Sequence, residues 1–317
     1  MDRQDKIIID DLFPFTLTRS ALDIRVGIFT LREKWDFISE GKNFFSDHNI
    51  PESTIPTKQL VDELSGGIKE KSLIATQIKF PWQIIQFNDE QIRNDFIIIS
   101  QSRKSQIVSS TNNVISRENI FLEEGAKVEY CNLNASMGPI YIGKNTEIME
   151  GSSIRGPFAL CEGAVVKMNS RIYGATTIGP YSIVGGEIKN SVLFGYSNKA
   201  HDGYLGDAVI GEWCNLGAGT SNSNLKNNAE DVHVWNQRRK EFMNVGLKCG
   251  LMMGDYSRCA INTSFNSGTV VGICCNIFGS GLTPKYIPDF SWGHDGSVKY
   301  DFEKAIRDIK NWKKLKN

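Results

Sequence analysis

The chain has 317 residues, of which 36 are basic and 36 acidic, so its formal charge is zero. A neutral chain has no general electrostatic attraction for nucleic acid or anionic lipid, and no apolar run reaches the ~18 residues that span a bilayer. With 40% hydrophobic and 23% charged residues the composition is globular, which excludes a disordered or collagen-like chain. We therefore expect a cytoplasmic protein with no nucleic-acid or membrane partner.

The first third of the chain predicts a small α/β domain over residues 1–110. It contains an apolar run at 7–10, a helix-like stretch at 31–37, a second such segment at 57–64 and a short strand at 95–100. Most of the 29 glycines follow residue 124, so the remainder of the chain is of a different kind.

From residue 140 the sequence repeats every six residues. The third residue of eight successive hexads is a branched aliphatic: Ile142, Ile148, Ile154, Leu160, Val166, Ile172, Ile178 and Val184. A step of six turns a helix through roughly 600°, so these positions would not form one helical stripe. Each hexad also ends in turn-forming or polar residues, which excludes one long strand. The pattern resumes at Leu205, Ile210 and Leu216 and near Val271.

A parallel β-helix with triangular coils explains this repeat. Each hexad supplies a short strand and a corner, three hexads make a coil of about 18 residues, and the aliphatic side chain points inward onto its equivalent about 4.8 Å away. We expect this mainly β prism over residues 111–290, with a cap at each end.

The seven cysteines have irregular spacing, which fits neither a disulfide framework nor a zinc motif. We expect free thiols that act as small buried hydrophobic groups, and no metal site.

Residues 291–317 predict an amphipathic C-terminal helix. Its apolar face consists of Phe302, Ala305, Ile306, Ile309 and Trp312. Acidic residues precede this face and lysines follow it, which matches the helix macrodipole. We expect the lysines to face solvent and the apolar stripe to pack on a neighbouring chain.

Polar side chains gather where the hexads are interrupted, at residues 187–207. Loops that interrupt a solenoid project on one face, where they can form a site. His201 stands in this loop, and an imidazole can take a proton from an amine or hydroxyl near neutral pH. Its polar neighbours in the sequence are Lys189, Lys199, Asp202 and Tyr204.

The hexads break again after residue 219, and the stretch at 215–228 is rich in glycine, serine and asparagine. At a coil corner such a stretch exposes backbone N–H groups, which can bind an oxyanion or the amide and phosphate groups of a cofactor. Ordinary turns use the same residue types, so this composition alone leaves both interpretations open.

The segment 187–224 resembles the acetyltransferase half of the bifunctional bacterial enzymes that acetylate glucosamine-1-phosphate and then uridylylate it. That half is a left-handed parallel β-helix of hexapeptide repeats. Its pattern is E-M-K, then N-H-L-x-Y-L-G-D-A-x-I-G, then N-I-G-A-G-T and an asparagine. The matching residues here are Glu187, Lys189, Ala200, His201, Tyr204 to Ala208, Ile210, Gly211, Asn215, Gly217 to Thr220 and Asn224.

The resemblance implies acyl transfer to a sugar amine. His201 corresponds to the general base that takes a proton as the amine attacks the thioester of acetyl-CoA, the cosubstrate. Arg171, Lys189 and Tyr204 match positions that hold the sugar phosphate. The family needs no metal for this reaction.

The same resemblance implies further contacts. Asn215 and Asn224 match amides that line the sugar and acyl pocket, and Ala218 and Gly219 match backbone that meets the thioester carbonyl. In the family this pocket lies between the prisms of a homotrimer.

Two segments depart from the family pattern. The family's Gly-Ser-Asp-Thr motif, whose serine contacts the cofactor, is replaced here by the stretch GLKC at 246–249. The loop at 230–245 is longer and more basic. Arg238 and Arg239 in this loop either bind CoA phosphates through charge-assisted contacts or lie on a solvated loop.

The N-terminal stretch LFPFTLTRSALDIRVGIFTLREKW resembles the opening of a divergent group of sugar nucleotidyltransferases. Residues 1–110 lack the glycine-rich, basic loop that holds a nucleoside triphosphate. We therefore expect a shortened, non-catalytic domain that caps or assembles the protein. Its cations that could still bind the phosphates of a nucleotide-sugar are Arg19, Arg25, Arg32 and Lys34.

The leading interpretation is a CoA-dependent N-acetyltransferase acting on an amino sugar phosphate or a nucleotide-linked amino sugar. One alternative is a nucleotidyltransferase with an altered N-terminal site. The other is a catalytically silent trimeric scaffold that binds nucleotide-sugars.

Overall fold

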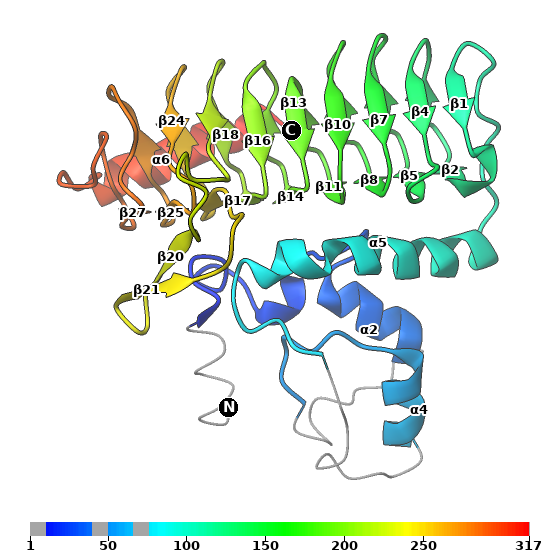
Figure 1. Ribbon diagram of the computed structural model, residues 1–317, viewed down its shortest axis with the longest axis horizontal. Coiled ribbons are helices and arrows are strands. Elements are labelled where there is room, and N and C mark those ends of the chain that lie inside the picture. Colours follow the sequence, from blue (N-terminus) through cyan, green and yellow to red (C-terminus); the bar gives the residue numbers. More distant parts are fainter. Residues whose placement is uncertain (1–10, 40–49, 66–75, 317) are drawn as a thin grey trace.

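The structure is a computed structural model, and it describes residues 11–39, 50–65 and 76–316. Its central body is a parallel β-helix in which successive coils add one short strand to each of three sheets (Figure 1). The chain is therefore mainly β, as the hexads predicted, with helices along the sides of the prism.

The three sheets form the faces of the prism. Sheet I consists of β1 (Asn113–Ile115), β4 (Asn132–Asn134), β7 (Ser153–Arg155), β10 (Arg171–Tyr173), β13 (Glu187–Lys189) and β16 (Tyr204–Gly206). Sheet II consists of β2 (Ile120–Leu122), β5 (Ile140–Ile142), β8 (Phe158–Leu160), β11 (Thr176–Ile178), β14 (Val192–Gly195), β17 (Val209–Glu212), β22 (Met252–Met253), β25 (Val270–Val271) and β27 (Tyr286–Ile287). Sheet III consists of β3 (Lys127–Val128), β6 (Glu147–Ile148), β9 (Val165–Val166), β12 (Ile183–Val184), β15 (Asn198–Lys199), β18 (Asn215–Leu216), β23 (Arg258–Cys259) and β26 (Asn276–Ile277).

Two smaller pairs account for the remaining strands of the described residues. They are the parallel pair β19 (Ser221–Asn222) and β24 (Ser264–Phe265), and the antiparallel hairpin β20 (His233–Asn236) and β21 (Glu241–Asn244). The hairpin projects from the prism on the side where the N-terminal part of the chain lies (Figure 1).

The predicted aliphatic series forms the interior of the prism. Ile142 pairs with Leu160 in sheet II and Ile154 with Ile172 in sheet I, each a coil of 18 residues. All eight predicted side chains are at most 2% exposed. The inward register and the parallel β-helix are therefore confirmed.

The coils shorten near the predicted site. Val184 pairs with Lys199, only fifteen residues later. Two of the missing residues are lost at the corner after Val184, where only Gly185 and Gly186 connect β12 to β13. The corresponding corners after β9 and β15 contain four residues each. The polar loop predicted at 187–207 therefore belongs to regular but shortened coils.

Helix α5 (Gln83–Ser102) packs on sheet II at β11 and β14, α2 (Leu31–Ser39) pairs with α5 through Lys34 and Asp95, and α4 (Lys58–Ser65) packs on α2, farther from the prism. The helices predicted at 31–37 and 57–64 are confirmed, and the apolar run at 7–10 lies outside the described residues. The strand predicted at 95–100 is wrong, because this run forms the last turns of α5, with Asp95 and Ile99 buried on its inner face. In the part of the chain that the structure describes, no helix is long and apolar enough to cross a membrane.

The N-terminal helices share a hydrophobic core with the prism. Phe15, Trp35 and Ile85 belong to one buried cluster with Phe194 of β14 and Met252 of β22. Short 3-10 turns lie at Ala21–Asp23 and Arg117–Asn119. Residues 11–102, where described, therefore cover the outer face of sheet II.

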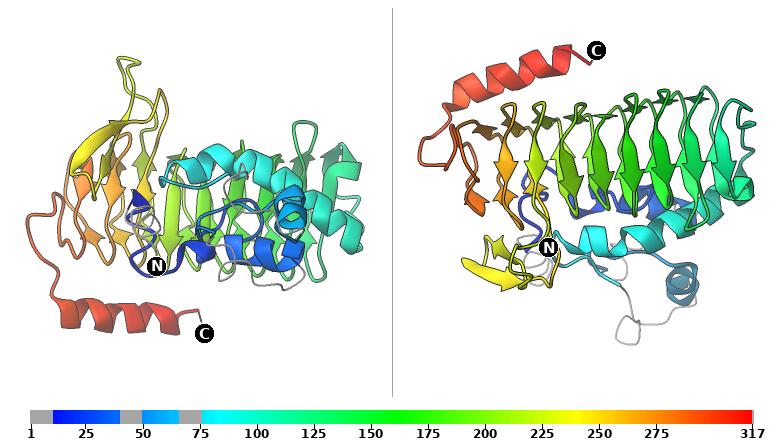
Figure 2. Two further views of the ribbon diagram at one scale, coloured as in Figure 1. Left: turned by 90° about the horizontal axis from the view of Figure 1, so that it is seen from below. Right: turned by 45° about the horizontal axis from the view of Figure 1, so that its top comes forward.

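The predicted C-terminal helix is α6 (Phe302–Lys314), which runs along the outside of its own prism (Figure 2). Asp301 caps its first turn by accepting a hydrogen bond from the Lys304 N–H at 2.8 Å. The prediction that all its lysines face solvent is wrong, because Lys316 donates a 2.7 Å hydrogen bond to the Tyr181 carbonyl. In this single chain, the apolar stripe also packs on the prism itself, where Phe302 contacts Phe290 at 5.7 Å between ring centroids.

All seven cysteines are unpaired and buried, as predicted. Cys131, Cys214, Cys259 and Cys275 belong to the buried core of the prism, where burial raises the pKa of each thiol.

Candidate active site

His201 lies at the corner between sheets III and I, in the turn that joins β15 to β16. In the preceding coil the same corner is two residues shorter, so the prism is cut back beside this turn. Gly186 is required there, because its φ is +76° and a Cβ would meet the His201 carbonyl oxygen at 2.8 Å. The shortened corner therefore leaves His201 exposed at a step in the surface.

The strands of sheet I next to this corner carry polar side chains on their outer face. Arg171, Glu187 and Tyr204 form one row across β10, β13 and β16, and Tyr173 and Lys189 lie in the second row. The two rows flank the buried column of Ile172, Ile188 and Leu205. The register thus brings together three of the predicted substrate-binding residues.

The contacts within these rows leave the cations open to an anion. The Tyr173 hydroxyl donates to Glu187 at 2.6 Å, which raises the pKa of that phenol. The Lys189 ammonium lies 5.9 Å from the centroid of the Tyr173 ring. The Arg171 guanidinium donates to the Asn169 carbonyl at 3.4 Å and approaches the Asp202 carboxylate at 3.9 Å, and its side chain is 56% exposed. An exposed ion pair of this kind contributes little free energy, so a phosphate could displace Asp202 from the guanidinium.

Tyr204 and Asn224 meet at the other end of β16. The Asn224 amide donates to the Tyr204 hydroxyl at 3.0 Å and also to the Asp207 carboxylate. Asn190 donates to the same carboxylate at 2.6 Å. Burial raises the pKa of Tyr204 to about 12, so its hydroxyl keeps its proton at neutral pH.

Lys199 does not belong to this outward cluster, although its place in the sequence suggested so. Its side chain points into the prism and is 1% exposed. Its ammonium donates to the carbonyls of Gly185, at 3.2 Å, and of His201.

Ala218 and Gly219 lie at the same corner as His201, one coil further along. The Gly219 N–H donates to the Asp202 carbonyl at 3.0 Å, which links the two corners directly. Asn215 lies instead at the other end of its strand, on sheet III, where its side-chain oxygen accepts from Asn198 at 3.4 Å.

Arg238 and Arg239 are not brought to His201 within one chain. Both lie in the hairpin beside the N-terminal helices (Figure 1). The Arg238 guanidinium binds both oxygens of the buried Asp11 carboxylate, at 2.9 and 2.6 Å. Arg239 lies 5.6 Å from the Phe80 ring centroid and 3.8 Å from Glu241.

The four N-terminal cations proposed for phosphate binding are all paired within the chain. The pairs are Arg19 with Asp255 and Glu212, Arg25 with Glu33, Arg32 with Asp23, and Lys34 with Asp95. Arg19 and Lys34 are also buried. These cations therefore hold the N-terminal helices together and against the prism, and they offer little to a nucleotide.

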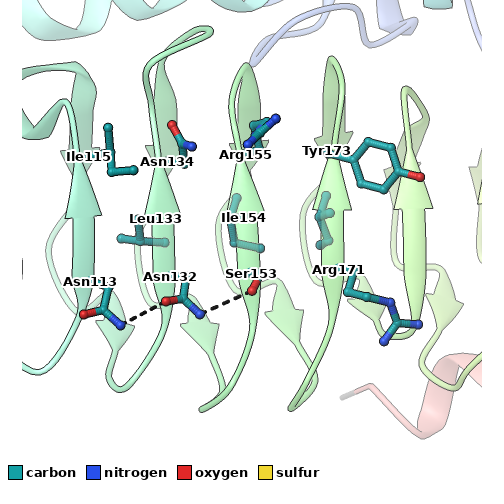
Figure 3. Close-up of a pocket in the computed structure, with 11 residues that line it drawn as sticks. Asn113, Ile115, Asn132, Leu133, Asn134, Ser153, Ile154, Arg155, Arg171 and Tyr173 are labelled. Atoms are coloured by element: carbon teal, nitrogen blue, oxygen red, sulfur yellow. Dashed lines mark hydrogen bonds between the residues drawn. The ribbon is translucent and has the colours of Figure 1, made fainter.

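A groove of about 460 Å³ extends along sheet I from this cluster (Figure 3). Along one side of it, Asn113 donates to Asn132 at 3.0 Å, and Asn132 donates to Ser153 at 3.3 Å. Arg171 and Tyr173 close the groove at the end nearest His201. The groove that leads to the cluster thus exposes mostly carbon atoms, although asparagine, serine and arginine side chains line it as well.

Comparison with known proteins places the chain near sugar-1-phosphate enzymes. A family model described as sugar nucleotidyl transferase matches residues 4–48. The chain is 29% identical over 266 residues to the bifunctional protein GlmU of Methanocaldococcus jannaschii, covering 83% of this chain and 58% of that protein. It is 30% identical over 200 residues to the bifunctional sugar-1-phosphate nucleotidylyltransferase/acetyltransferase of Sulfurisphaera tokodaii, covering 62% and 43%.

Among solved structures, the polySia specific acetyltransferase NeuO matches 65% of this chain and 98% of its own, with 16% identity and a TM-score of 0.29. The chain spans about half the length of the curated relatives that it matches. The resemblances stated for its two parts, to the bifunctional sugar-1-phosphate enzymes and to sugar nucleotidyltransferases, are confirmed.

Sequence reasoning missed the shortened corner and Tyr173. The signal was present, because the aliphatic positions Val184 and Ile188 are four residues apart where the hexads place them six apart. The GLKC stretch at 246–249 leads from the hairpin to β22, and Cys249 within it is buried, at 2% exposed.

Proposed function

We propose that this chain is a CoA-dependent acyltransferase, specifically an N-acetyltransferase acting on an amino sugar phosphate or a nucleotide-linked amino sugar. The observation that carries the proposal is the exposed His201 at a cut-back corner beside the cations Arg171 and Lys189. His201 would take the proton of the attacking amine, while the cations bind the sugar phosphate. The similarity to a sugar-1-phosphate nucleotidylyltransferase/acetyltransferase supports this substrate class.

The remaining groups divide between the sugar and the thioester. Tyr204 and Asn224, bonded to each other at 3.0 Å, would line the sugar pocket. The backbone at Ala218 and Gly219, one coil from the histidine, would donate N–H groups to the oxyanion that develops on the thioester of acetyl-CoA.

A homotrimer would complete this site. Asn215 and Arg239 lie away from His201 within one chain, on sheet III and on the hairpin. A neighbouring prism related by a three-fold axis would present these side chains to the acyl pocket and the CoA phosphates. Arg238 would then support the hairpin through Asp11 rather than contact CoA itself.

The N-terminal helices are proposed to be a non-catalytic cover of sheet II. Although a nucleotidyltransferase model matches 4–48, the cations that would bind triphosphate are engaged by carboxylates. We expect no pyrophosphate release from nucleoside triphosphates and sugar phosphates. Release at a rate that Arg25→Met lowers would favour the nucleotidyltransferase instead.

The acyltransferase is tested by following free thiol release from acetyl-CoA with a panel of amino sugars and their phosphates. Loss of a general base lowers the rate by about 10²–10⁴-fold, and we expect this for His201→Ala. His294→Ala, near the far end of the prism, is the matched control and should keep full activity. Absence of thiol release with every amino sugar, or full activity of His201→Ala, would contradict the proposal.

A further inference from the structure

The inner column of sheet III contains one charged side chain. Its members, in coil order, are Val128, Ile148, Val166, Val184, Lys199, Leu216, Cys259 and Ile277. Lys199 is 1% exposed, and burying an ammonium group costs several kcal/mol unless its hydrogen bonds are satisfied. A charged side chain at this position therefore indicates a role that an aliphatic residue could not fill.

Lys199 supplies a donor that other corners obtain from serine. At the corresponding corners of earlier coils, the hydroxyls of Ser152 and Ser170 donate to the Lys167 carbonyl, at 3.0 and 2.5 Å. In the next coil Gly186 takes the place of Ser170 and has no hydroxyl. The Lys199 ammonium instead donates from inside the prism to the Gly185 carbonyl, which corresponds to that of Lys167, and it donates to the His201 carbonyl as well.

The rest of this turn is fixed by the coils on either side. The Glu187 N–H donates to the Gly203 carbonyl at 3.3 Å, and the Gly219 N–H donates to the Asp202 carbonyl at 3.0 Å. Neither bond involves His201, whose carbonyl accepts from Lys199. The lysine also donates to Gly185 at 3.2 Å, so it ties the histidine to the shortened corner.

We infer that Lys199 is a positioning residue: by holding the His201 carbonyl against the Gly185 corner, it sets where the imidazole stands for proton transfer. The inference rests on the proposed acyltransferase function. A base must lie within hydrogen-bond reach of the amine, and a displacement of about 1 Å lowers the rate by up to ~10²-fold.

The test is a double-mutant cycle on thiol release. Lys199→Met keeps the length and apolar stem but removes the donors, and we expect kcat to fall about 10-fold or more with little change in KM for the amino sugar. In the His201→Ala background the same substitution should have no further effect, because the lysine acts through the histidine. Leu216→Met, in the same inner column, is the control and should leave kcat unchanged.

The outcomes separate this inference from the proposed function. An inactive wild type, or a fully active His201→Ala, refutes the function itself. An active wild type with impaired His201→Ala and unimpaired Lys199→Met refutes only the role of Lys199. A loss in Lys199→Met that persists in the His201→Ala background indicates a merely structural role and also overturns the inference. If Lys199→Met does not fold, Lys199→Gln replaces it in the same cycle.

Discussion

Because of Lys199, the free energy of unfolding of this protein should change with pH in the alkaline range. Burial lowers the pKa of its ammonium to about 8, whereas an unfolded lysine titrates near ~10.4. Below pH 8 both states are protonated, and the folded state carries the full cost of the buried charge. Between these two values the folded state releases its proton while the unfolded chain keeps it, so stability rises with pH.

Lys199→Met should remove this dependence. We expect the unfolding free energy of the variant, relative to wild type, to decrease by about 3 kcal/mol between pH 7 and pH 10.5, since one pKa unit corresponds to ~1.4 kcal/mol. Urea unfolding at several pH values measures the difference. The neighbouring titratable groups Asp202 and Cys259 are present in both proteins, so their contributions cancel to first order. A difference that does not change with pH would contradict the assignment.

The outward placement of the candidate site residues could be predicted, whereas the inward placement of Lys199 could not. Lys189, His201 and Tyr204 follow from their spacing in a motif, which is a property of the sequence alone. Whether residue 199 points in or out depends on a coil of fifteen residues, and that length is set by the packing of Gly185 and Gly186 against the next turn. In the sequence, this contact is visible only as a shorter spacing between two aliphatic residues, Val184 and Ile188.

Helix α6 lies on a column of aromatic corners. Tyr181, Tyr196 and Trp213 each occupy the left-handed corner of successive coils, and their rings stack at 5.3 and 4.6 Å. The Lys313 ammonium lies 5.2 Å from the Trp213 ring centroid and 5.3 Å from that of Tyr256. A cation between two ring faces is attracted to both, so this lysine fastens the last turns of the helix.

Lys313→Met should therefore loosen α6 without unfolding the prism. We expect faster amide hydrogen exchange across the last two turns of the helix, corresponding to about 1 kcal/mol of lost protection. Lys314→Met changes an exposed lysine of the same turn and should leave exchange unchanged. Equal exchange in the two variants would show that the ring contacts do not hold the helix.

The wrong strand prediction at 95–100 shows that a short apolar run does not by itself distinguish a strand from a helix. The run Phe96-Ile97-Ile98-Ile99 fits a buried strand when taken alone, but Ile97 is 52% exposed and Ile99 is buried, as one face of a helix requires. The inner face of α5 continues upstream through Asn88, whose amide donates to the Ala175 carbonyl at 2.8 Å. The helix is selected by its packing on sheet II, which the run itself does not encode.

At the scale of the whole molecule, the N-terminal helices and the prism share a hydrophobic core and long-range hydrogen bonds. The Thr177 hydroxyl of β11 donates to the Gly27 carbonyl at 2.9 Å. The side-chain oxygen of Asn88 in α5 accepts from the same hydroxyl at 3.2 Å and from the Gly27 N–H at 2.7 Å. Arg19 extends this junction along the prism to Asp255 and Glu212. The hexads predicted the prism well, because its register repeats in the sequence. The junction is built from single long-range pairs, which have no period.

Arg19→Met tests whether this junction stabilises the protein. The Arg19 and Asp255 side chains are 8% and 2% exposed, so removing the guanidinium leaves a carboxylate buried with fewer partners. We expect a loss of unfolding free energy on the order of 3 kcal/mol, felt across one urea transition that helices and prism share. Arg32→Met removes the same group from a pair with Asp23 whose side chains are 49% and 42% exposed, and should cost less than about 1 kcal/mol. Equal losses in the two variants, or separate transitions for the helices and the prism, would show that the N-terminal segment is an independent attachment.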